Sequence, residues 1–331
     1  MNTTIKDYLG NLQISSKQSF KNLAMYPLIC PDSIQLDYLL LDDALAGSVI
    51  DIVEVDKGGS VPDLKVVNKS AKMVLLLDGE ELVGAKQNRV INTTILIAAN
   101  STTTIPVSCV ESGRWTYRSE KFYSENRVMS PTMRSRKTEQ VNASKKINNT
   151  YRSDQGAIWD EINWKAQRMN AMSDTMCMSA IYKKEMPNIQ EYVKHFSLSD
   201  NQAGAVFLIN GKVVGLDSFG KNHTFSKVFN KLIESYALDA IDWLKEDKNT
   251  EKKEDSADAF LATVGSAQTE STSSVALGSD VRLESEKIAG FALMLDDTLL
   301  HLSAFARSNG NKETSRGSKM ERFSQRRRNR E

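Results

Sequence analysis

The side chains best suited to chemistry gather in one short segment that follows the apolar run at residues 74–77. The pair Asp78-Gly79 is typical of a turn at the end of a buried strand. Gly84-Ala85 then lets the backbone approach another strand or a ligand closely. Carboxylates, a lysine, amides and an arginine are thus concentrated beside a turn, a pattern that favours a binding or catalytic site. The candidate residues of this segment are Asp78, Glu80, Glu81, Lys86, Gln87, Asn88, Arg89 and Asn92.

These residue types suit an anion that carries a sugar or a base. Lys86 and Arg89 can hold phosphate or carboxylate, the arginine in a bidentate manner. The amides of Gln87, Asn88 and Asn92 supply donors and acceptors for an amide, a ribose or a base edge. The alternative is an internal network, in which buried Glu–Arg pairs and Asn–backbone hydrogen bonds fix a β-corner.

A second dense block occupies residues 109–115. Cys109 is a nucleophile only if a cation such as Arg114 stabilises its thiolate, and an isolated cysteine on a strand is more often a small buried hydrophobe. Arg114 also offers an anion contact, and Trp115 is either a stacking surface or part of the core. Carboxylates in such a place serve as acid, base or divalent-metal ligand. The candidates of both blocks for these catalytic roles are Glu80, Glu81 and Glu111.

An internal similarity links residues 204–219 with residues 290–305, since each begins with Gly, contains a turn pair and ends in Leu-x-x-Phe. We expect two equivalent hairpins side by side in one sheet, although any two hairpins can share this pattern. By this correspondence Asp217 faces the same cleft as His301, which is otherwise a core histidine. Arg282 is either a further polar contribution to the site or one half of a strand-end ion pair.

Strand patterns dominate the first half of the chain. Short apolar runs separated by turns favour an antiparallel, sandwich-like sheet. No helical pattern intervenes between them, which argues against a parallel doubly wound sheet. One helical turn is expected at residues 42–45. The predicted strands are residues 49–55, 64–67, 73–77, 93–98 and 104–110.

The second half mixes helices with antiparallel hairpins, so the predicted fold class is α+β. Asn210-Gly211 supplies the positive φ angles of a two-residue turn and predicts a hairpin over residues 205–216. An apolar stripe with helical spacing predicts a long helix at residues 224–245. We further expect helices at 158–169, 175–184 and 187–196, strands at 259–264, 281–282 and 289–305, and a polar loop at 268–274.

Composition along the chain predicts its organisation. Residues 1–19 form an N-terminal arm or short amphipathic helix, and residues 20–125 form a β-rich region that carries the polar motif. Residues 126–153 are rich in Lys and Arg and poor in acids, which predicts a basic linker or flexible loop. Residues 154–306 hold helices and paired hairpins that pack on the first region. The basic tail, residues 307–331, is expected to be disordered.

Several classes of protein are disfavoured. The chain has 331 residues and a net charge of +1, so it is not a polyelectrolyte binder. No apolar run reaches the length of a membrane span, and the start lacks the pattern of a signal peptide. Widely spaced cysteines indicate a reduced compartment, hence a cytoplasmic protein, and their spacing predicts no metal site. P-loop, α/β-hydrolase, zincin and Rossmann motifs are absent.

Two motifs carry a resemblance to a known family. Residues 76–89 and 105–115 resemble the ADP-ribosylglycohydrolase- and rhodanese-phosphatase-associated domain family, and the resemblance extends over residues 20–305. It includes a late Gly-x-Asp-x-Arg-Leu motif at residues 278–283. The family's name reflects genomic neighbours, so the resemblance implies a role near NAD and ADP-ribose metabolism rather than a particular reaction.

We therefore expect a protein that binds, or binds and processes, an anionic ADP-ribose-, NAD- or nucleotide-like small molecule, with a divalent cation as a conceivable cofactor. The alternative is a non-enzymatic ligand-sensing or protein-interaction module in a bacterial stress or phage-defence context. Nucleic acid is disfavoured as a partner, because only electrostatics would support it. If Glu80, Arg89, Glu111 and Arg114 converge on one open pocket, a site is favoured. If they pair internally, a scaffold is favoured. The reaction and the oligomeric state stay open.

Overall fold

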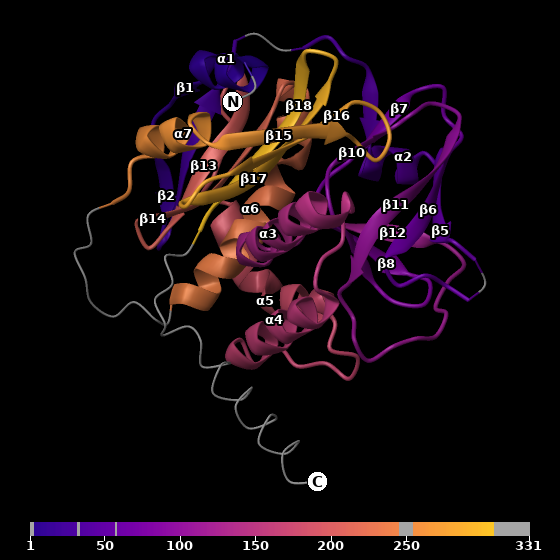
Figure 1. Ribbon diagram of the computed structural model, residues 1–331. Coiled ribbons are helices and arrows are strands. Elements are labelled where there is room, and N and C mark those ends of the chain that lie inside the picture. The colour runs from indigo at the N-terminus through magenta and orange to yellow at the C-terminus, as the bar shows by residue number, and fades with distance from the viewer. Residues whose placement is uncertain (1–2, 32–33, 57, 245–253, 308–331) are drawn as a thin grey trace.

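The computed structural model describes residues 3–31, 34–56, 58–244 and 254–307. Its strands form a nine-stranded, a six-stranded and a three-stranded sheet. Most of the helices gather around the largest sheet and beside the smaller ones (Figure 1). Helices and antiparallel strands are both abundant and the N-terminal half is rich in strands, so the predicted α+β class is confirmed.

The two smaller sheets form the sandwich-like β-unit expected in the N-terminal half. Its elements are β4 (Tyr38–Leu40), α2 (Leu41–Ala46), β5 (Ile50–Glu54), β6 (Asp63–Asn68), β7 (Met73–Leu76), β8 (Glu80–Gly84), β9 (Arg89–Ile91), β10 (Ile95–Ile97), β11 (Ser101–Cys109) and β12 (Phe122–Val128). The strand orders are β12-β8-β9-β11-β6-β5 and β10-β7-β4. Side chains of both sheets, such as Ile52 and Val74, share one hydrophobic core. Buried and half-buried residues alternate along β5 and β6, as in a sheet with one face towards water.

The nine-stranded sheet has the order β1-β3-β13-β14-β18-β17-β16-β15, with β2 paired to β3. Its strands are β1 (Gln13–Ile14), β2 (Gln18–Phe20), β3 (Leu23–Ile29), β13 (Gln202–Ile209), β14 (Lys212–Phe219), β15 (Gln268–Ser273), β16 (Ser279–Glu284), β17 (Ile288–Leu295) and β18 (Thr298–Ala306). Successive side chains point to opposite faces, so Val206 joins one core cluster and Phe207 another. Helices α1 (Thr3–Asn11) and α7 (Ala257–Gly265) contribute to the first cluster.

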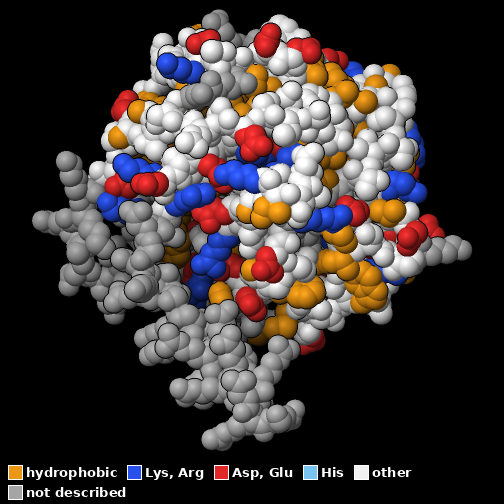
Figure 2. All heavy atoms as spheres, in the orientation of Figure 1, with side chains coloured by type: hydrophobic (Ala, Val, Ile, Leu, Met, Phe, Trp, Pro, Cys, Tyr) orange, Lys and Arg blue, Asp and Glu red, His pale blue; other side chains and the backbone are white. Residues whose placement is uncertain are grey.

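The other face of this sheet is covered by α3 (Pro131–Asn148) and α6 (Asn222–Leu244) (Figure 1). Helix α5 (Met178–Val193) packs on α6, and α4 (Gln155–Arg168) packs beside α3 and α5. The apolar stripe expected on the long helix is real, since Phe225, Val228 and Leu232 lie in the core. Within the described ranges, none of the helices combines the length and the apolar character needed to cross a bilayer. Acidic and basic side chains are interspersed on the face drawn in Figure 2, in keeping with the small net charge.

The two similar segments are equivalent hairpins that lie side by side, as expected, because β14 pairs with β18. Each turn begins with a residue in the left-handed region, Asn210 and Asp296, both with a φ of 51°. Each hairpin has a register shift at the same place, after Phe207 in one and after Leu293 in the other. A shared bulge is a specific feature, so the likeness reflects a structural repeat rather than a generic hairpin pattern.

The segment 126–153, predicted to be a basic linker or flexible loop, is instead the end of β12 and the helix α3. Arg134, Lys137 and Lys145 of this helix are buried. The prediction was wrong because the helix lacks the apolar stripe on which periodicity relies. Its buried face is charged, and carboxylates and carbonyl oxygens of other elements accept hydrogen bonds from that face.

Three smaller expectations also fail. Residues 259–264 belong to helix α7, which starts where the Ser256 side chain accepts a hydrogen bond from the Ala259 amide. Residues 268–274 are mostly the strand β15, an edge strand whose exposed polar side chains conceal the strand pattern. One helix, α5, runs through Pro187, because this residue lies on the exposed side, where water can solvate the carbonyl that loses its partner.

The two ends of the chain are only partly described. The expected arm, residues 1–19, contains helix α1 and the strand β1, and β2 begins within it. The predicted disordered tail, residues 307–331, lies outside the described residues except for Arg307.

Helix α3 connects the β-unit to the nine-stranded sheet through one arginine. The Arg134 Nε donates to Asp78 at 3.1 Å, and its two terminal nitrogens donate to Asp217 at 3.0 and 2.8 Å. Asp78 follows β7, whereas Asp217 lies on β14, and all three side chains are buried. Lys137, one helical turn later, donates to the second oxygen of Asp78.

Replacement of Arg134 by Met should lower the free energy of unfolding by roughly 3–5 kcal/mol, because two buried carboxylates lose their shared cation. The matched control is Lys146→Ala, on the same helix, where the side chain is half exposed and pairs with the partly exposed Glu284. A surface pair of this kind contributes about 0–1 kcal/mol. Urea denaturation of both variants measures the difference, and equal losses would contradict the role assigned to Arg134.

Candidate functional site

The polar motif forms a tight β-corner between β8 and β9. Gly79, with a φ of 79°, closes the turn beside Arg134, where an added Cβ would lie 3.1 Å from the arginine Cδ. Gly84 has a φ of 128°, and a Cβ there would collide with Ser119 Oγ at 2.6 Å. The glycines therefore allow the corner to pack against its neighbours. The candidate residues of this segment are all buried, namely Asp78, Glu80, Glu81, Lys86, Gln87, Asn88, Arg89 and Asn92.

The candidate catalytic carboxylates belong to separate networks, and Glu80, Glu111 and Arg114 pair internally, as expected of a scaffold. Glu80 accepts the Leu77 amide at 2.7 Å and pairs with Lys231 of α6. Glu81 lies 3.6 Å from the Arg127 guanidinium. Glu111 pairs with Arg114 at 2.7 Å. In the described part of the chain, no three acidic, Cys or His side chains come together as metal ligands would.

Arg114 is fully engaged with the protein. Its Nε and one terminal nitrogen donate to Glu111 at 2.9 and 2.7 Å. The same side chain donates to the Ala85 carbonyl at 2.6 Å and to Asn88 Oδ1 at 3.1 Å. Burial raises the pKa of Glu111, but hydrogen bonds from Arg114 and Thr175 outweigh it and leave the pKa below its ordinary value. Arg114 and Glu111 thus hold the loop between β8 and β9 in place.

Arg89 differs from Arg114 because much of its guanidinium is unused. The side chain is 0% exposed, and one terminal nitrogen donates to Gln87 Oε1 at 3.1 Å. Its Nε and other terminal nitrogen have no hydrogen-bond partner among the described residues, and the nearest carboxylate oxygen, of Glu54, is 3.9 Å away. The second oxygen of Glu54 is also unpartnered there. Unsatisfied buried charged groups are rare and mark functional sites or bound water.

A second cation and two exposed rings border Arg89. The Lys86 ammonium donates to the Gly58 carbonyl and lies 5.3 Å from the Trp115 ring and 5.2 Å from the Tyr117 ring. Arg89 lies 5.6 Å from the same Trp115 ring. Trp115 is 44% exposed and Tyr117 is 51% exposed, so Trp115 is a surface residue rather than part of the core. We call Glu54, Lys86, Arg89, Trp115 and Tyr117 the Arg89 cluster.

Cys109 lies near this cluster as a protonated thiol. Burial raises its pKa to about 11, and the neighbouring Arg89 charge lowers it less than burial raises it. The Gln155 side chain accepts from the Cys109 amide at 2.7 Å and donates to its carbonyl at 2.8 Å. The geometry therefore fits the small buried hydrophobe of the two alternatives.

The later candidates lie in networks of their own, outside the Arg89 cluster. Burial lowers the pKa of His301, which stacks on Phe219 with ring centroids 4.3 Å apart. Its Nδ1 is 2.7 Å from Thr94 Oγ1, and its Nε2 is 3.4 Å from Asp217. Burial raises the pKa of Asp217, but the Arg134 charge and the His301 contact outweigh it and lower the value overall.

Two more of the motif residues complete their bonding inside the protein. Arg282 donates to both oxygens of Asp280, at 2.7 and 2.8 Å, and to Thr93 at 2.7 Å. The Asn92 amide donates to the Tyr151 carbonyl at 2.9 Å and accepts from the Ser108 hydroxyl at 2.6 Å. Sequence reasoning missed two members of the Arg89 cluster. Glu54 ends a strand that we recognised only as structural, and Tyr117 lies beyond the second motif.

With this geometry in place, the comparisons with known proteins identify the family. The model of the ARG and Rhodanese-Phosphatase-superfamily-associated Protein domain matches residues 11–305. The chain belongs to this family, as its two motifs predicted. No curated protein and no solved structure matches the chain. The family description associates the domain with ARG and rhodanese-phosphatase proteins, and it assigns no reaction.

Glu54 and Arg89 allow a test of whether this region is a binding site or part of the scaffold. The double variant Glu54→Gln/Arg89→Met removes two buried, poorly paired charges, and such a removal is neutral or stabilising by about 1–4 kcal/mol. We therefore expect a free energy of unfolding equal to or above that of the wild type, measured by urea denaturation. A loss above about 2 kcal/mol would assign the pair to the scaffold.

A second prediction concerns Glu81, which has no hydrogen-bond partner among the described residues. Burial raises its pKa from 4.5 to about 7, and Arg127 offsets this only in part. The folded state then holds a proton that the unfolded state has lost, so stability falls as the pH rises between these values. The total loss is about 3 kcal/mol, at ~1.4 kcal/mol per pH unit.

Glu81→Gln should abolish this part of the pH dependence, so the variant gains on the wild type between pH 4.5 and 7. Urea denaturation at a series of pH values measures the gain. The control is Glu120→Gln, at an exposed position, which should follow the wild-type profile. Parallel profiles for Glu81→Gln and the wild type would show that Glu81 ionises normally.

Proposed function

We propose that the Arg89 cluster binds the anionic group of an ADP-ribose-, NAD- or nucleotide-like small molecule. The observation that carries the proposal is the buried Arg89 guanidinium, whose Nε and one terminal nitrogen have no partner among the described residues. These two nitrogens form one edge of the fork that binds phosphate or carboxylate in a bidentate manner. An internal scaffold arginine would use that edge, as Arg134 and Arg114 do.

The neighbours of Arg89 fit the rest of such a ligand. Lys86 adds a second positive charge, and the Gln87 amide, already bonded to Arg89, adds a donor. Trp115 and Tyr117 present partly exposed rings on which a flat base can stack. Both rings belong to the segment between β11 and β12. Because Arg89 is buried, the proposal requires these side chains to move when the ligand binds.

Binding without chemistry is the form of the proposal that the geometry favours. Glu80, Glu81 and Glu111 are dispersed, and Cys109 is a protonated thiol. Of the carboxylates, Glu54 alone belongs to the cluster, so it is the candidate acid or base if a reaction does occur. We therefore propose a ligand-sensing module, in a stress or phage-defence context, to which a divalent cation would come with the phosphates of the ligand.

Titration calorimetry with ADP-ribose, NAD, ADP and AMP, each with and without magnesium, tests the proposal. We expect at least one of them to bind, and Arg89→Met to weaken that binding by roughly 10- to 100-fold, the worth of a charge-assisted hydrogen-bond pair. Arg136→Ala, an exposed arginine on α3, should leave the affinity unchanged. The proposal fails if none of these compounds binds under either condition.

A further inference from the structure

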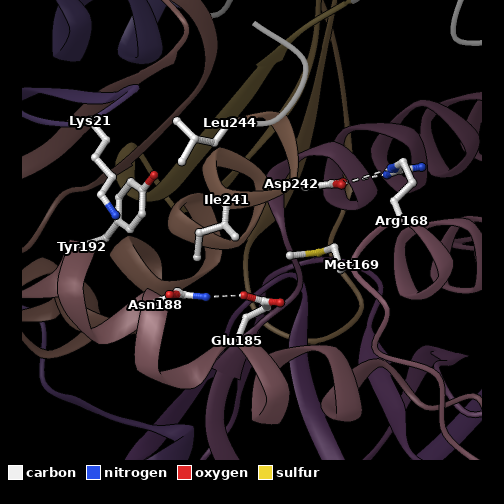
Figure 3. Close-up of a pocket in the computed structure, with 9 residues that line it drawn as sticks. All are labelled: Lys21, Arg168, Met169, Glu185, Asn188, Tyr192, Ile241, Asp242 and Leu244. Carbon is white, nitrogen blue, oxygen red and sulfur yellow. Dashed lines mark hydrogen bonds and ion pairs between the residues drawn. The ribbon is translucent and has the colours of Figure 1, made fainter. Parts of the chain in front are cut away.

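A polar pocket of about 210 Å³ opens where α4, α5 and α6 meet the turn between β2 and β3 (Figure 3). It lies outside the Arg89 cluster and shares no residue with it. Its apolar lining comes from the end of α4 and the C-terminal turn of α6, and Leu244 of that turn is 43% exposed. The lining residues are Lys21, Arg168, Met169, Glu185, Asn188, Tyr192, Ile241, Asp242 and Leu244.

One of the two carboxylates in this pocket is neutralised by the protein. Asp242 accepts hydrogen bonds from Arg168 at 3.1 and 2.7 Å and from Lys165 at 2.8 Å. The other, Glu185, accepts a hydrogen bond from the Asn188 amide at 2.7 Å. Glu185 is only 8% exposed and forms no ion pair within the described ranges. A buried carboxylate without a cation is costly, so a positive group in the pocket would be stabilised.

The pocket also holds a cation, the exposed side chain of Lys21. Lys21 occupies the β2–β3 turn with a φ of 49°, and its ammonium lies 5.1 Å from the Phe20 ring and 5.5 Å from the Tyr192 ring. Among the residues that the structure describes, it forms no ion pair. Figure 3 shows Lys21 and Glu185 on different sides of Ile241, so the two opposite charges are separated by apolar surface.

We propose that this pocket binds an extended zwitterion, such as an ω-amino acid or a short peptide. The ammonium of the ligand would pair with Glu185 and its carboxylate with Lys21. Its apolar chain would lie on Ile241, between the two charged ends. This arrangement would give each of the two charges an opposite charge in the ligand, which neither a simple anion nor a simple cation can do.

Three probes with the same apolar body test the proposal, namely 6-aminohexanoate, hexanoate and hexylamine. Binding to the full chain is measured by protein-observed NMR titration. We expect 6-aminohexanoate to bind at least fivefold more tightly than either singly charged probe. No binding of 6-aminohexanoate, or equal affinity for the three probes, overturns the proposal.

Two variants separate the ends of the ligand. Lys21→Ala should reduce the affinity for 6-aminohexanoate to that for hexylamine, and Glu185→Gln should reduce it to that for hexanoate. The matched controls, Lys183→Ala on α5 and Glu270→Gln on β15, remove exposed charges that do not line the pocket and should change nothing. Because Lys21 is exposed, we expect Lys21→Ala to fold, and this variant tests the proposal even if Glu185→Gln is unstable. An unchanged preference in Lys21→Ala contradicts the proposal.

Discussion

The contact on which the structure depends most is the buried arginine between two aspartates. Arg134 holds Asp78 of the β-unit and Asp217 of the nine-stranded sheet at the same time. A buried charge is stable only if an opposite charge or hydrogen bonds compensate it. A shift of the β-unit relative to the nine-stranded sheet would therefore separate Arg134 from one of its two carboxylates. The Asp217 carboxylate also accepts a hydrogen bond from the Ser303 hydroxyl at 2.9 Å. Ser303 has the position in the second hairpin that Asp217 has in the first. The repeat thus supplies the sheet position at which helix α3 is attached.

The buried polar residues form two sets. Residues of the closed set complete their hydrogen bonds within the protein, and residues of the open set keep polar atoms without a partner among the described residues. In the closed set, Arg134, Arg114 and Arg282 direct their guanidinium groups at carboxylates and carbonyls of the protein. In the open set, Arg89 retains two unpartnered nitrogens. A fold rarely keeps such a group for stability, because an unsatisfied buried donor costs free energy. The function proposed for the Arg89 cluster follows from this contrast.

Much of the fold was predictable, because its strands and hairpins bury apolar side chains at regular spacing. Asn210-Gly211 and the similarity between residues 204–219 and 290–305 predicted the centre of the large sheet. Helix α3 was not predictable, since its buried face carries the basic residues Arg134, Lys137 and Lys145 among few apolar ones. The motifs predicted Lys86, Arg89 and Trp115. They could not predict Glu54, which only the folding of a distant segment brings to the same place, and they end two residues before Tyr117.

The central claim is that Arg89 is open to a ligand whereas the arginines of the closed set are not. A metabolite pulldown read by mass spectrometry tests it most directly. The wild-type chain is compared with the Glu54→Gln/Arg89→Met variant after both are incubated with a small-molecule extract. The account predicts that the wild type enriches an anionic metabolite that carries a ribose or a base, and that the variant loses it while remaining folded. Identical metabolite sets from two folded proteins would contradict it.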